Sequence, residues 1–303
     1  MRIAVIGAGG VGGFLGARLV EAEFDVTVVA RGEHARALKR DGLLIHAAGG
    51  EHRVVLPKIV TAEQLDGVFD LVCLAVKWRD LEEVCAEAAR VIAARGLVLP
   101  LLNGLEAEDV CARFVGAQRT LAAVAYMSSG ITAPGEIYVH GHARLGLSPY
   151  REGQAQDLER AAACFERARV PVRRHADYRS MLWEKMVWNA PFNAICALTQ
   201  KTAGQVADEL SGLVREAMQE VIRVAAAEGV ELPAVLADGM LQLTRAEFPN
   251  TLPSMLQDVR SGRPTEVEVL QGAVVARAQA AGVAVPVLRT LADLVRGLTA
   301  PGR

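Results

Sequence analysis

The chain has 303 residues, of which 51% are hydrophobic, and its formal net charge at pH 7 is −2. This length indicates about two domains of ~150 residues each, and the near-neutral charge argues against a nucleic acid or an anionic membrane surface as a partner. No apolar run reaches the ~18 residues that a membrane-spanning helix needs.

A short apolar run opens the chain, and a glycine-rich turn follows it. Residues 2–6 have the length of a buried strand, residues 13–20 have helical periodicity, and between them stands Gly7-Ala8-Gly9-Gly10-Val11-Gly12. Gly7 permits a tight turn, Gly9 lets the backbone approach a diphosphate, and Gly12 lets the helix pack closely against the strand. The stretch therefore predicts a dinucleotide-binding turn at a helix N-terminus, although a glycine-rich connection without a ligand has the same pattern.

The cysteines are scattered and show no C-x-x-C spacing. They are Cys73, Cys85, Cys111, Cys164 and Cys196. An odd number at these spacings argues against a disulfide framework or a zinc site, and it favours small core residues in a reducing compartment. Because the glycine turn occupies the N-terminus, we also expect no signal peptide and a cytoplasmic protein.

Arg31 follows a second apolar run at residues 26–30, about 20 residues beyond the glycine turn. The residue that reads the adenosine ribose belongs at this place. An acidic side chain there would bind the ribose 2′-hydroxyl, whereas a guanidinium suits a 2′-phosphate. The sequence therefore predicts NADPH as the cofactor, with a solvent-exposed turn arginine as the alternative.

Strands and helices alternate through the first half of the chain. The pattern predicts a helix over 33–42, a strand pair over 43–56, a strand over 70–76, a helix over 81–94 and a strand over 97–102. This alternation is typical of a mostly parallel sheet, whose ligands bind beyond the carboxyl ends of the strands. Arg31, Lys77 and Asn103 each follow such an end, so we expect them to mark a site, although each alone would fit a solvated loop.

Further strand patterns precede a change to helical signal. Residues 120–126, 136–140 and 143–147 indicate an antiparallel extension of the sheet. A helix over 154–168 and a strand over 170–172 then close the domain. From Arg179 onward the pattern is almost entirely helical. We therefore expect an α/β domain with a mostly parallel sheet over residues 1–176, and an all-helical domain over residues 177–303.

Three polar side chains interrupt an apolar helix that begins near Arg179. Lys185, Asn189 and Asn193 are spaced i, i+4 and i+8, so they project from one side of the helix. Burying such groups without partners costs several kcal/mol, so the spacing predicts a polar site. The alternative is a lysine that reaches solvent and two asparagines that bridge to neighbouring helices. Pro191 predicts a kink or local irregularity.

Two later segments supply further polar candidates. Ser254 follows a loop over 249–253 and is a natural N-cap for the next helix. Glu266 lies in the expected first turn of a helix that begins near Arg263, where the helix dipole favours an acidic side chain. A second interpretation makes Glu266 the counter-charge of Lys185.

With these motifs assembled, the chain resembles the ketopantoate reductase (2-dehydropantoate 2-reductase) family over essentially its whole length. The resemblance rests on the glycine turn, Arg31, Lys77, Asn103-Gly104, the helix carrying Lys185, Asn189 and Asn193, the segment Ser254-Met255-Leu256-Gln257-Asp258, and Thr265-Glu266. The glycine turn is generic to dinucleotide enzymes, whereas the helix and the last two segments are more specific.

The resemblance implies an N-terminal Rossmann domain, a helical C-terminal domain, and NADPH-dependent reduction of a 2-oxo acid in the cleft between them. The expected reaction converts 2-dehydropantoate to pantoate in pantothenate biosynthesis. The resemblance makes Lys185 the catalytic proton donor, with Glu266 orienting it or binding a hydroxyl. The ligand-positioning residues would be Asn103, Asn189, Asn193 and Ser254. Lys77, Asn103 and Glu266 would also contact the cofactor.

Two other functions are compatible with the sequence. One is a related NADP-dependent hydroxy-acid or imine reductase, and the other is a non-catalytic NADPH-sensing protein. The intact polar stripe argues against a sensor, because a sensor needs no proton donor there. The sequence leaves open which 2-oxo acid is the substrate, and it is compatible with a homodimer.

Overall fold

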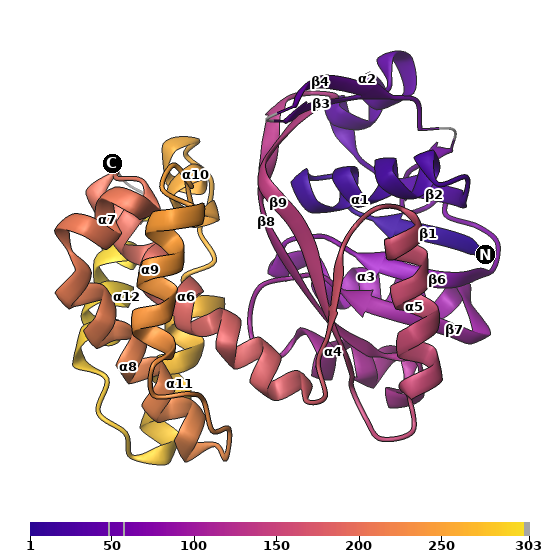
Figure 1. The fold of residues 1–303 in the computed structure, drawn as a ribbon. Coiled ribbons are helices and arrows are strands. Elements are labelled where there is room, and N and C mark those ends of the chain that lie inside the picture. Colours follow the sequence, from indigo (N-terminus) through magenta and orange to yellow (C-terminus); the bar gives the residue numbers. More distant parts are fainter. Residues whose placement is uncertain (48, 57, 300–303) are drawn as a thin grey trace. The chain divides into compact units, whose positions relative to one another are not determined.

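The computed structural model describes residues 1–47, 49–56 and 58–299, and the chain divides into two compact units (Figure 1). The first unit consists of Met1–Leu102 and Glu106–Tyr178, and the second of Asn103–Leu105 and the chain from Arg179 onward. Residue 48 of the expected strand pair, and residues 300–303 of the expected helical domain, lie outside the described residues.

A five-stranded parallel sheet forms the centre of the first unit. Its strands are β1 (Arg2–Ile6), β2 (Asp25–Val29), β5 (Ile59–Val60), β6 (Phe69–Leu74) and β7 (Ile92–Pro100). Their order is β5-β2-β1-β6-β7, and every neighbouring pair is parallel. The chain builds outward from β1 in both directions, so a topological switch point lies beyond the carboxyl ends of β1 and β6. The predicted parallel α/β fold is therefore confirmed.

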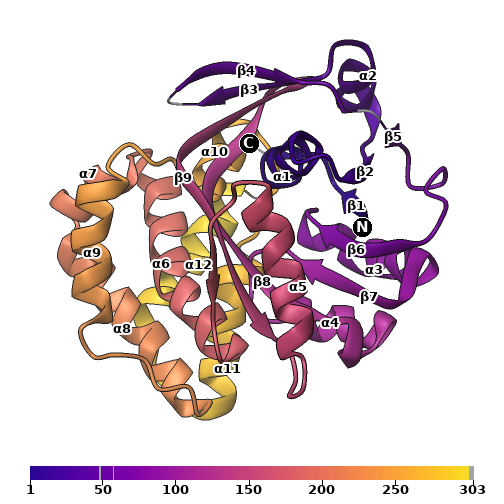
Figure 2. The ribbon, with the colours of Figure 1, turned by 45° about the vertical axis from the view of Figure 1, so that its right-hand side comes forward.

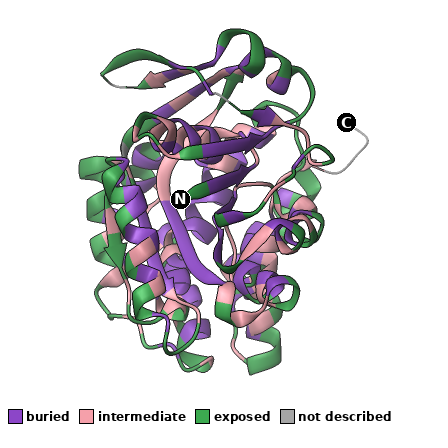
Figure 3. Ribbon diagram, turned by 90° about the vertical axis from the view of Figure 1, so that its right-hand side faces the viewer, coloured by how far each residue is buried: buried purple, intermediate pink, exposed green. Residues whose placement is uncertain are grey.

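Alternate residues of each strand enter separate apolar cores on the two faces of this sheet. Ile3 and Val5 of β1 face one core, whereas Ala4 and Ile6 face the other. On the first face lie α1 (Gly10–Glu21), α2 (Gly32–Asp41) and α5 (Ala155–Arg167), and on the second lie α3 (Leu81–Val91) and α4 (Ala107–Val115). Two short 3₁₀ turns are η1 (Trp78–Asp80) and η2 (Ala117–Arg119). Most residues of these strands are buried as a result (Figure 3).

The strands that follow residue 120 do not extend the parallel sheet, as was expected, but belong to a second sheet. It contains β3 (Leu43–Ala47), β4 (Gly50–Val54), β8 (Leu121–Ala133), β9 (Glu136–Pro149) and β10 (Val172–Arg174). The long strands β8 and β9 form an antiparallel hairpin, and β9 runs without the break expected near residue 141 (Figure 2). Because β9 pairs in parallel with β3, the hairpin joins this separate sheet. Ile137 and Leu145 of β9 enter the same core as α1.

The second unit is helical, as expected. Its helices are α6 (Tyr178–Thr199), α7 (Ala203–Glu209), α8 (Ser211–Ala227), α9 (Leu236–Glu247), α10 (Ser254–Arg260), α11 (Ala273–Ala281) and α12 (Pro286–Thr299), with a π-helical turn η3 (Glu268–Gly272) before α11. Helix α6 continues through Pro191 without a break, and the kink or local irregularity expected at this proline stays a prediction. Ala190 and Phe192 on either side are fully buried, and this packing holds the helix in place.

All five cysteines are buried, which confirms them as core residues. Within the described part of the chain, no helix is long and apolar enough to cross a membrane.

Candidate active site

The glycine turn between β1 and α1 is required by the packing around it. Gly7 has a φ of +102°, and a Cβ there would collide with the Ala75 carbonyl that follows β6. A Cβ on Gly12 would collide with the Gly7 carbonyl. Both positions therefore need glycine for steric reasons that belong to the protein itself.

Gly9 differs, because no protein atom lies within 4 Å of the place where its Cβ would stand. Gly9 is the N-cap residue of α1, and no side chain caps this helix. The first N–H groups of α1 therefore lack helical acceptors, and the positive end of the helix dipole faces the same space. An uncapped helix N-terminus beside open space fits the diphosphate of a dinucleotide.

Arg31 is the N-cap residue of α2, and its side chain is 76% exposed. Its Nη2 donates to the Asp80 carboxylate at 2.9 Å, and the Asp80 side chain is only 20% exposed. The Asp80 N–H also bonds to the Lys77 carbonyl at 3.0 Å. Asp80 thus joins the segments that follow β2 and β6. This link could not be predicted from the sequence, because an aspartate at position 80 also fits the start of a helix.

In the helical unit, α6 carries the polar stripe at unequal depth. Lys185 is half-buried, whereas Asn189 is 7% exposed and Asn193 only 2%. Asn189 Nδ2 donates to Asn103 Oδ1 at 3.3 Å. Asn103 belongs to this unit even though it follows β7, because the neighbouring Leu105 packs against the helical core.

Asn193 holds the start of α10. Its Nδ2 donates to the Asn189 carbonyl at 3.0 Å, and its Oδ1 accepts from Ser254 Oγ at 3.2 Å and from the Met255 N–H at 3.0 Å. Ser254 is therefore not the expected N-cap, because Pro253 occupies that position and Asn193 caps α10 from a different helix. The predicted residues Asn103, Asn189, Asn193 and Ser254 form one hydrogen-bonded chain.

Glu266 lies outside a regular helix. A helix was expected to begin near Arg263, but the first helical turn is η3, which begins at Glu268. The Glu266 carbonyl accepts from the N–H groups of Val269 and Leu270, both at 3.1 Å, and its side chain is half-buried. π-Helical turns are rare and occur frequently at functional sites, which keeps Glu266 a candidate.

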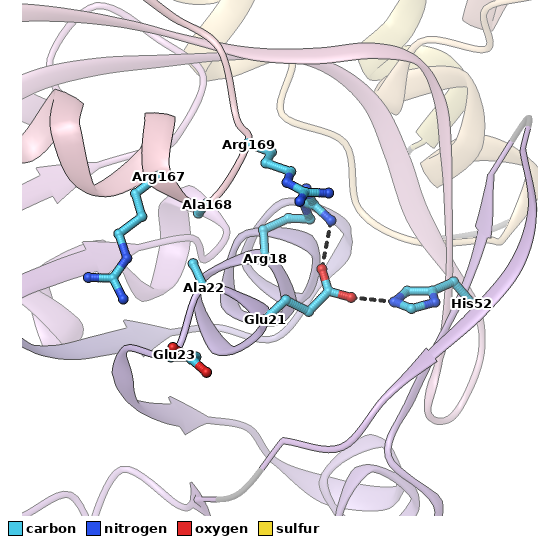
Figure 4. A pocket seen from close by; sticks show the side chains of 8 residues that line it. All are labelled: Arg18, Glu21, Ala22, Glu23, His52, Arg167, Ala168 and Arg169. Atoms are coloured by element: carbon cyan, nitrogen blue, oxygen red, sulfur yellow. Dashed lines mark hydrogen bonds and ion pairs between the residues drawn. The ribbon is translucent and has the colours of Figure 1, made fainter.

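One cavity of about 650 Å³ lies elsewhere on the first unit (Figure 4). It is lined by Arg18, Glu21, Ala22, Glu23, His52, Arg167, Ala168 and Arg169. Arg18 pairs with Glu21 at 2.6 Å, and Glu21 also contacts His52. Arg18 and Arg167 stand in the last turns of α1 and α5, where the helix dipole favours cations. Because these charges have structural explanations and no predicted site residue lines the cavity, we do not assign the reaction to it.

Two family models match most of the chain. The model described as "Ketopantoate reductase PanE/ApbA" matches residues 3–152, and the model described as "Ketopantoate reductase PanE/ApbA C terminal" matches residues 177–299. The chain is 33% identical over 302 residues to a 2-dehydropantoate 2-reductase of Halobacterium salinarum, covering 98% of both chains. It is 28% identical over 298 residues to an uncharacterized oxidoreductase of Bacillus subtilis, covering 96% of both.

Solved structures give the same picture of the fold. A 2-dehydropantoate 2-reductase from Geobacter metallireducens matches with a TM-score of 0.90 and 32% identity, over 98% of this chain and 99% of that chain. A D-mandelate dehydrogenase in complex with NADH and anilino(oxo)acetate matches with a TM-score of 0.92 over 99% and 98% of the two chains. Its sequence identity of 24% makes this second likeness one of fold alone.

Proposed function

This chain belongs to the ketopantoate reductase family of oxidoreductases, and we propose that it reduces a 2-oxo acid with NADPH. We propose 2-dehydropantoate as its substrate. The relatives with 2-dehydropantoate reductase activity in their names are about 30% identical to this chain.

The first unit would hold the cofactor. The space beside Gly9 and the uncapped N-terminus of α1 would receive the diphosphate, and Arg31 would bind the 2′-phosphate. Lys77, which follows β6 at the switch point, would contact the nicotinamide ribose. NADPH, when bound, supplies the hydride for the reduction.

The second unit would supply the proton and hold the substrate. Lys185 is the long cation on the stripe of α6, so it can donate a hydrogen bond to the developing alkoxide and then a proton. Asn189 lies one helical turn further along and would bind the substrate. Asn103 would hold the side-chain amide of Asn189 in place by accepting its hydrogen bond. Glu266 would orient the Lys185 ammonium or bind a substrate hydroxyl.

Asn193 and Ser254 would act together. Because the Asn193 acceptor is used by α10, we propose that Asn193 positions Ser254, and that the Ser254 hydroxyl meets the polar tail of the substrate. The observation that carries the proposal is this hydrogen-bonded chain from Asn103 to Ser254. It joins Asn103 and Ser254, from distant parts of the sequence, to the helix that also carries Lys185.

The test follows NADPH oxidation at its absorbance with 2-dehydropantoate and a panel of 2-oxo acids. The panel should contain branched aliphatic acids and one aryl 2-oxo acid, since one structural relative is a D-mandelate dehydrogenase. We expect fastest turnover with 2-dehydropantoate. Activity on 3-hydroxy acids or imines alone would favour a related reductase, and tight NADPH binding without any turnover would favour a sensor.

A further inference from the structure

His34, in the first turn of α2, connects the glycine turn to the turn between β8 and β9. Its Nε2 lies 2.8 Å from the Ala8 carbonyl oxygen, and its Nδ1 accepts from the Gly135 N–H at 3.1 Å. Because Gly135 is the donor in the second bond, Nδ1 must carry a lone pair. The imidazole is therefore neutral with its proton on Nε2, and that N–H donates to Ala8.

The direction of the Ala8 carbonyl determines where the next N–H of the glycine turn points. It lies outside the hydrogen-bond ladder of α1, whose first bond runs from the Gly13 N–H to the Gly9 carbonyl at 2.7 Å. In a planar trans peptide the C=O and the following N–H point in opposite directions. No peptide bond in the described part of the chain is cis. The bond from His34 thus sets the direction of the Gly9 N–H, at the residue that faces open space.

The Nδ1 side of the imidazole is held by Gly135, which lies in a closely packed turn. Gly135 is buried with a φ of +80°, and its carbonyl accepts from the Leu44 N–H of β3 at 2.9 Å. A Cβ on Gly135 would stand 3.0 Å from the Cβ of Ala37 on α2, so this turn is closely packed. His34 is therefore held by the second sheet on one side while it holds the Ala8 carbonyl on the other.

We propose that His34 is a positioning residue for cofactor binding: its neutral imidazole fixes the Ala8–Gly9 peptide plane and aims the Gly9 N–H at the dinucleotide diphosphate. This inference rests on the proposed function, because it assumes that the glycine turn binds a dinucleotide. It gives His34 no direct contact with the ligand. It assigns the second sheet a part in forming the nucleotide site.

The proposal makes diphosphate binding sensitive to pH. Burial lowers the pKa of His34 from its ordinary value of 6.5, and a protonated ring would turn an N–H toward the Gly135 N–H. The charged groups nearby are already paired: Glu33 with Arg36 on α2, and Glu136 beside the turn with His46 on β3. Arg31 at the start of α2 pairs with Asp80, and the residues of the glycine turn carry no charge.

The experiment measures dissociation constants by calorimetry from about pH 5 to about pH 8 for three ligands: NADPH, ADP-ribose and adenosine 2′-monophosphate. ADP-ribose carries the diphosphate without the 2′-phosphate, and adenosine 2′-monophosphate carries the 2′-phosphate without the diphosphate. The variants are His34→Ala, His34→Gln and His46→Gln. Glutamine retains one donor and one acceptor but does not titrate. His46→Gln is the matched control for a neighbouring histidine.

We expect His34→Ala to bind NADPH and ADP-ribose about fivefold to tenfold more weakly, the effect of losing one hydrogen bond, and to bind adenosine 2′-monophosphate like wild type. His34→Gln should recover most of the affinity and remove the weakening of ADP-ribose binding at low pH. His46→Gln should retain that weakening.

Three outcomes would overturn the proposal in distinguishable ways. If His34→Ala binds ADP-ribose as tightly as wild type, His34 does not act on the diphosphate. Equal weakening of all three ligands would show that His34 only supports α2 and Arg31. If the wild-type protein binds neither NADPH nor ADP-ribose, the proposed cofactor fails as well.

Discussion

The Arg31 guanidinium donates to the Asp80 carboxylate at 2.9 Å, which joins the start of α2 to the η1 turn. The bond uses only Nη2, so other N–H donors of the guanidinium remain for a ligand. Because Arg31 is 76% exposed, the pair contributes no more than about 1 kcal/mol. A 2′-phosphate can therefore share or displace the Asp80 contact.

Replacing Arg31 with alanine should remove most of the preference for NADPH. Charge-assisted hydrogen bonds are worth roughly 1.5–3 kcal/mol, so we expect wild type to bind NADPH about 10- to 100-fold more tightly than NADH. Fluorescence titration of both cofactors measures this ratio. Arg31→Ala should leave the NADH affinity nearly unchanged, and an equal loss for both cofactors would show that Arg31 supports the loop instead.

Asp80→Asn tests the same site by changing the partner of Arg31. The Asp80 carboxylate would lie close to the bound 2′-phosphate, and two like charges repel each other. We expect the variant to bind NADPH a few-fold more tightly than wild type and NADH equally well. Weaker NADPH binding would mean that Asp80 chiefly orients Arg31 for the phosphate.

Gly9→Val should damage cofactor binding much more than folding. The φ of −70° at Gly9 is accessible to any residue, and no protein atom lies within 4 Å of the added Cβ. A branched side chain there would occupy the space for the diphosphate. Valine is a poor N-cap, so the melting temperature should fall by only a few degrees. NADPH binding like that of wild type would contradict the assignment.

Gly12→Ala is the contrasting variant. Its Cβ would collide with the Gly7 carbonyl, which belongs to the backbone of a packed turn and cannot move aside as a flexible side chain could. We expect this variant to unfold at a clearly lower temperature even without a ligand, as measured by circular dichroism. The two glycines thus separate a requirement of the ligand from a requirement of the fold.

Local patterns predicted those parts of the molecule that local physics decides. The run of residues 2–6 and the glycines that follow it are confirmed as a strand and a turn, because strand length, turn geometry and helix start are all properties of adjacent residues. The stripe on α6 follows in the same way from helical spacing. Alternating strands and helices were enough to predict the parallel sheet.

Contacts between distant segments could not be predicted from the sequence. The β8–β9 hairpin joins the second sheet because Ile137 pairs with Ile45, and period-two alternation does not specify the partner strand. Ser254 has the chemistry of an N-cap, yet Asn193 of another helix takes over the capping. His34 is part of no recognisable sequence motif, because its role depends on two backbone groups from separate turns.

The stability of the protein should fall in mild acid through His34. Burial lowers the pKa of His34 in the folded state below 6.5, so the unfolded chain binds the proton more tightly. The contribution of neutral His34 to the free energy of unfolding is therefore fully present above about pH 6.5. It is lost as the pH falls through the pKa of His34 in the folded state. Melting temperatures of wild type and His34→Gln across this range measure the effect. Identical pH profiles for the two proteins would contradict it.

Glu220 should be a stabilising residue of the helical unit. It is 1% exposed, and its carboxylate accepts from the N–H groups of Val287 and Leu288 at 3.0 and 2.8 Å, in the first turn of α12. Removing it leaves the buried N–H of Leu288 and the half-buried N–H of Val287 without this acceptor, which costs about 2–4 kcal/mol. Denaturant unfolding of Glu220→Ala should show this loss, with Glu220→Gln intermediate. NADPH affinity should not change, because Glu220 lies in the other unit.

Lys185 is the residue on which the proposed mechanism depends most. It lies one turn before Asn189 on α6, and a general acid contributes about 10²- to 10⁴-fold to a rate. Lys185→Ala should lower kcat by that factor while NADPH affinity stays within a few-fold, because the turn proposed to bind the nucleotide lies in the first unit. Lys185 is half-buried, so losing its partly solvated contacts should shift the melting temperature by only a few degrees.

A purely structural lysine would give the reverse pattern, since a residue that only bridges helices would, on deletion, lower the melting temperature and leave turnover of the folded fraction intact. Measuring kcat, NADPH affinity and melting temperature on the same Lys185→Ala preparation separates these two roles. Lys185→Arg is the matched control, because it keeps the charge but holds its proton too tightly to act as an acid near neutral pH. We expect it to fold like wild type and to lose nearly as much kcat as the alanine variant. A folded Lys185→Ala protein with kcat within about threefold of wild type would remove Lys185 from the mechanism, because general acid catalysis contributes far more than this.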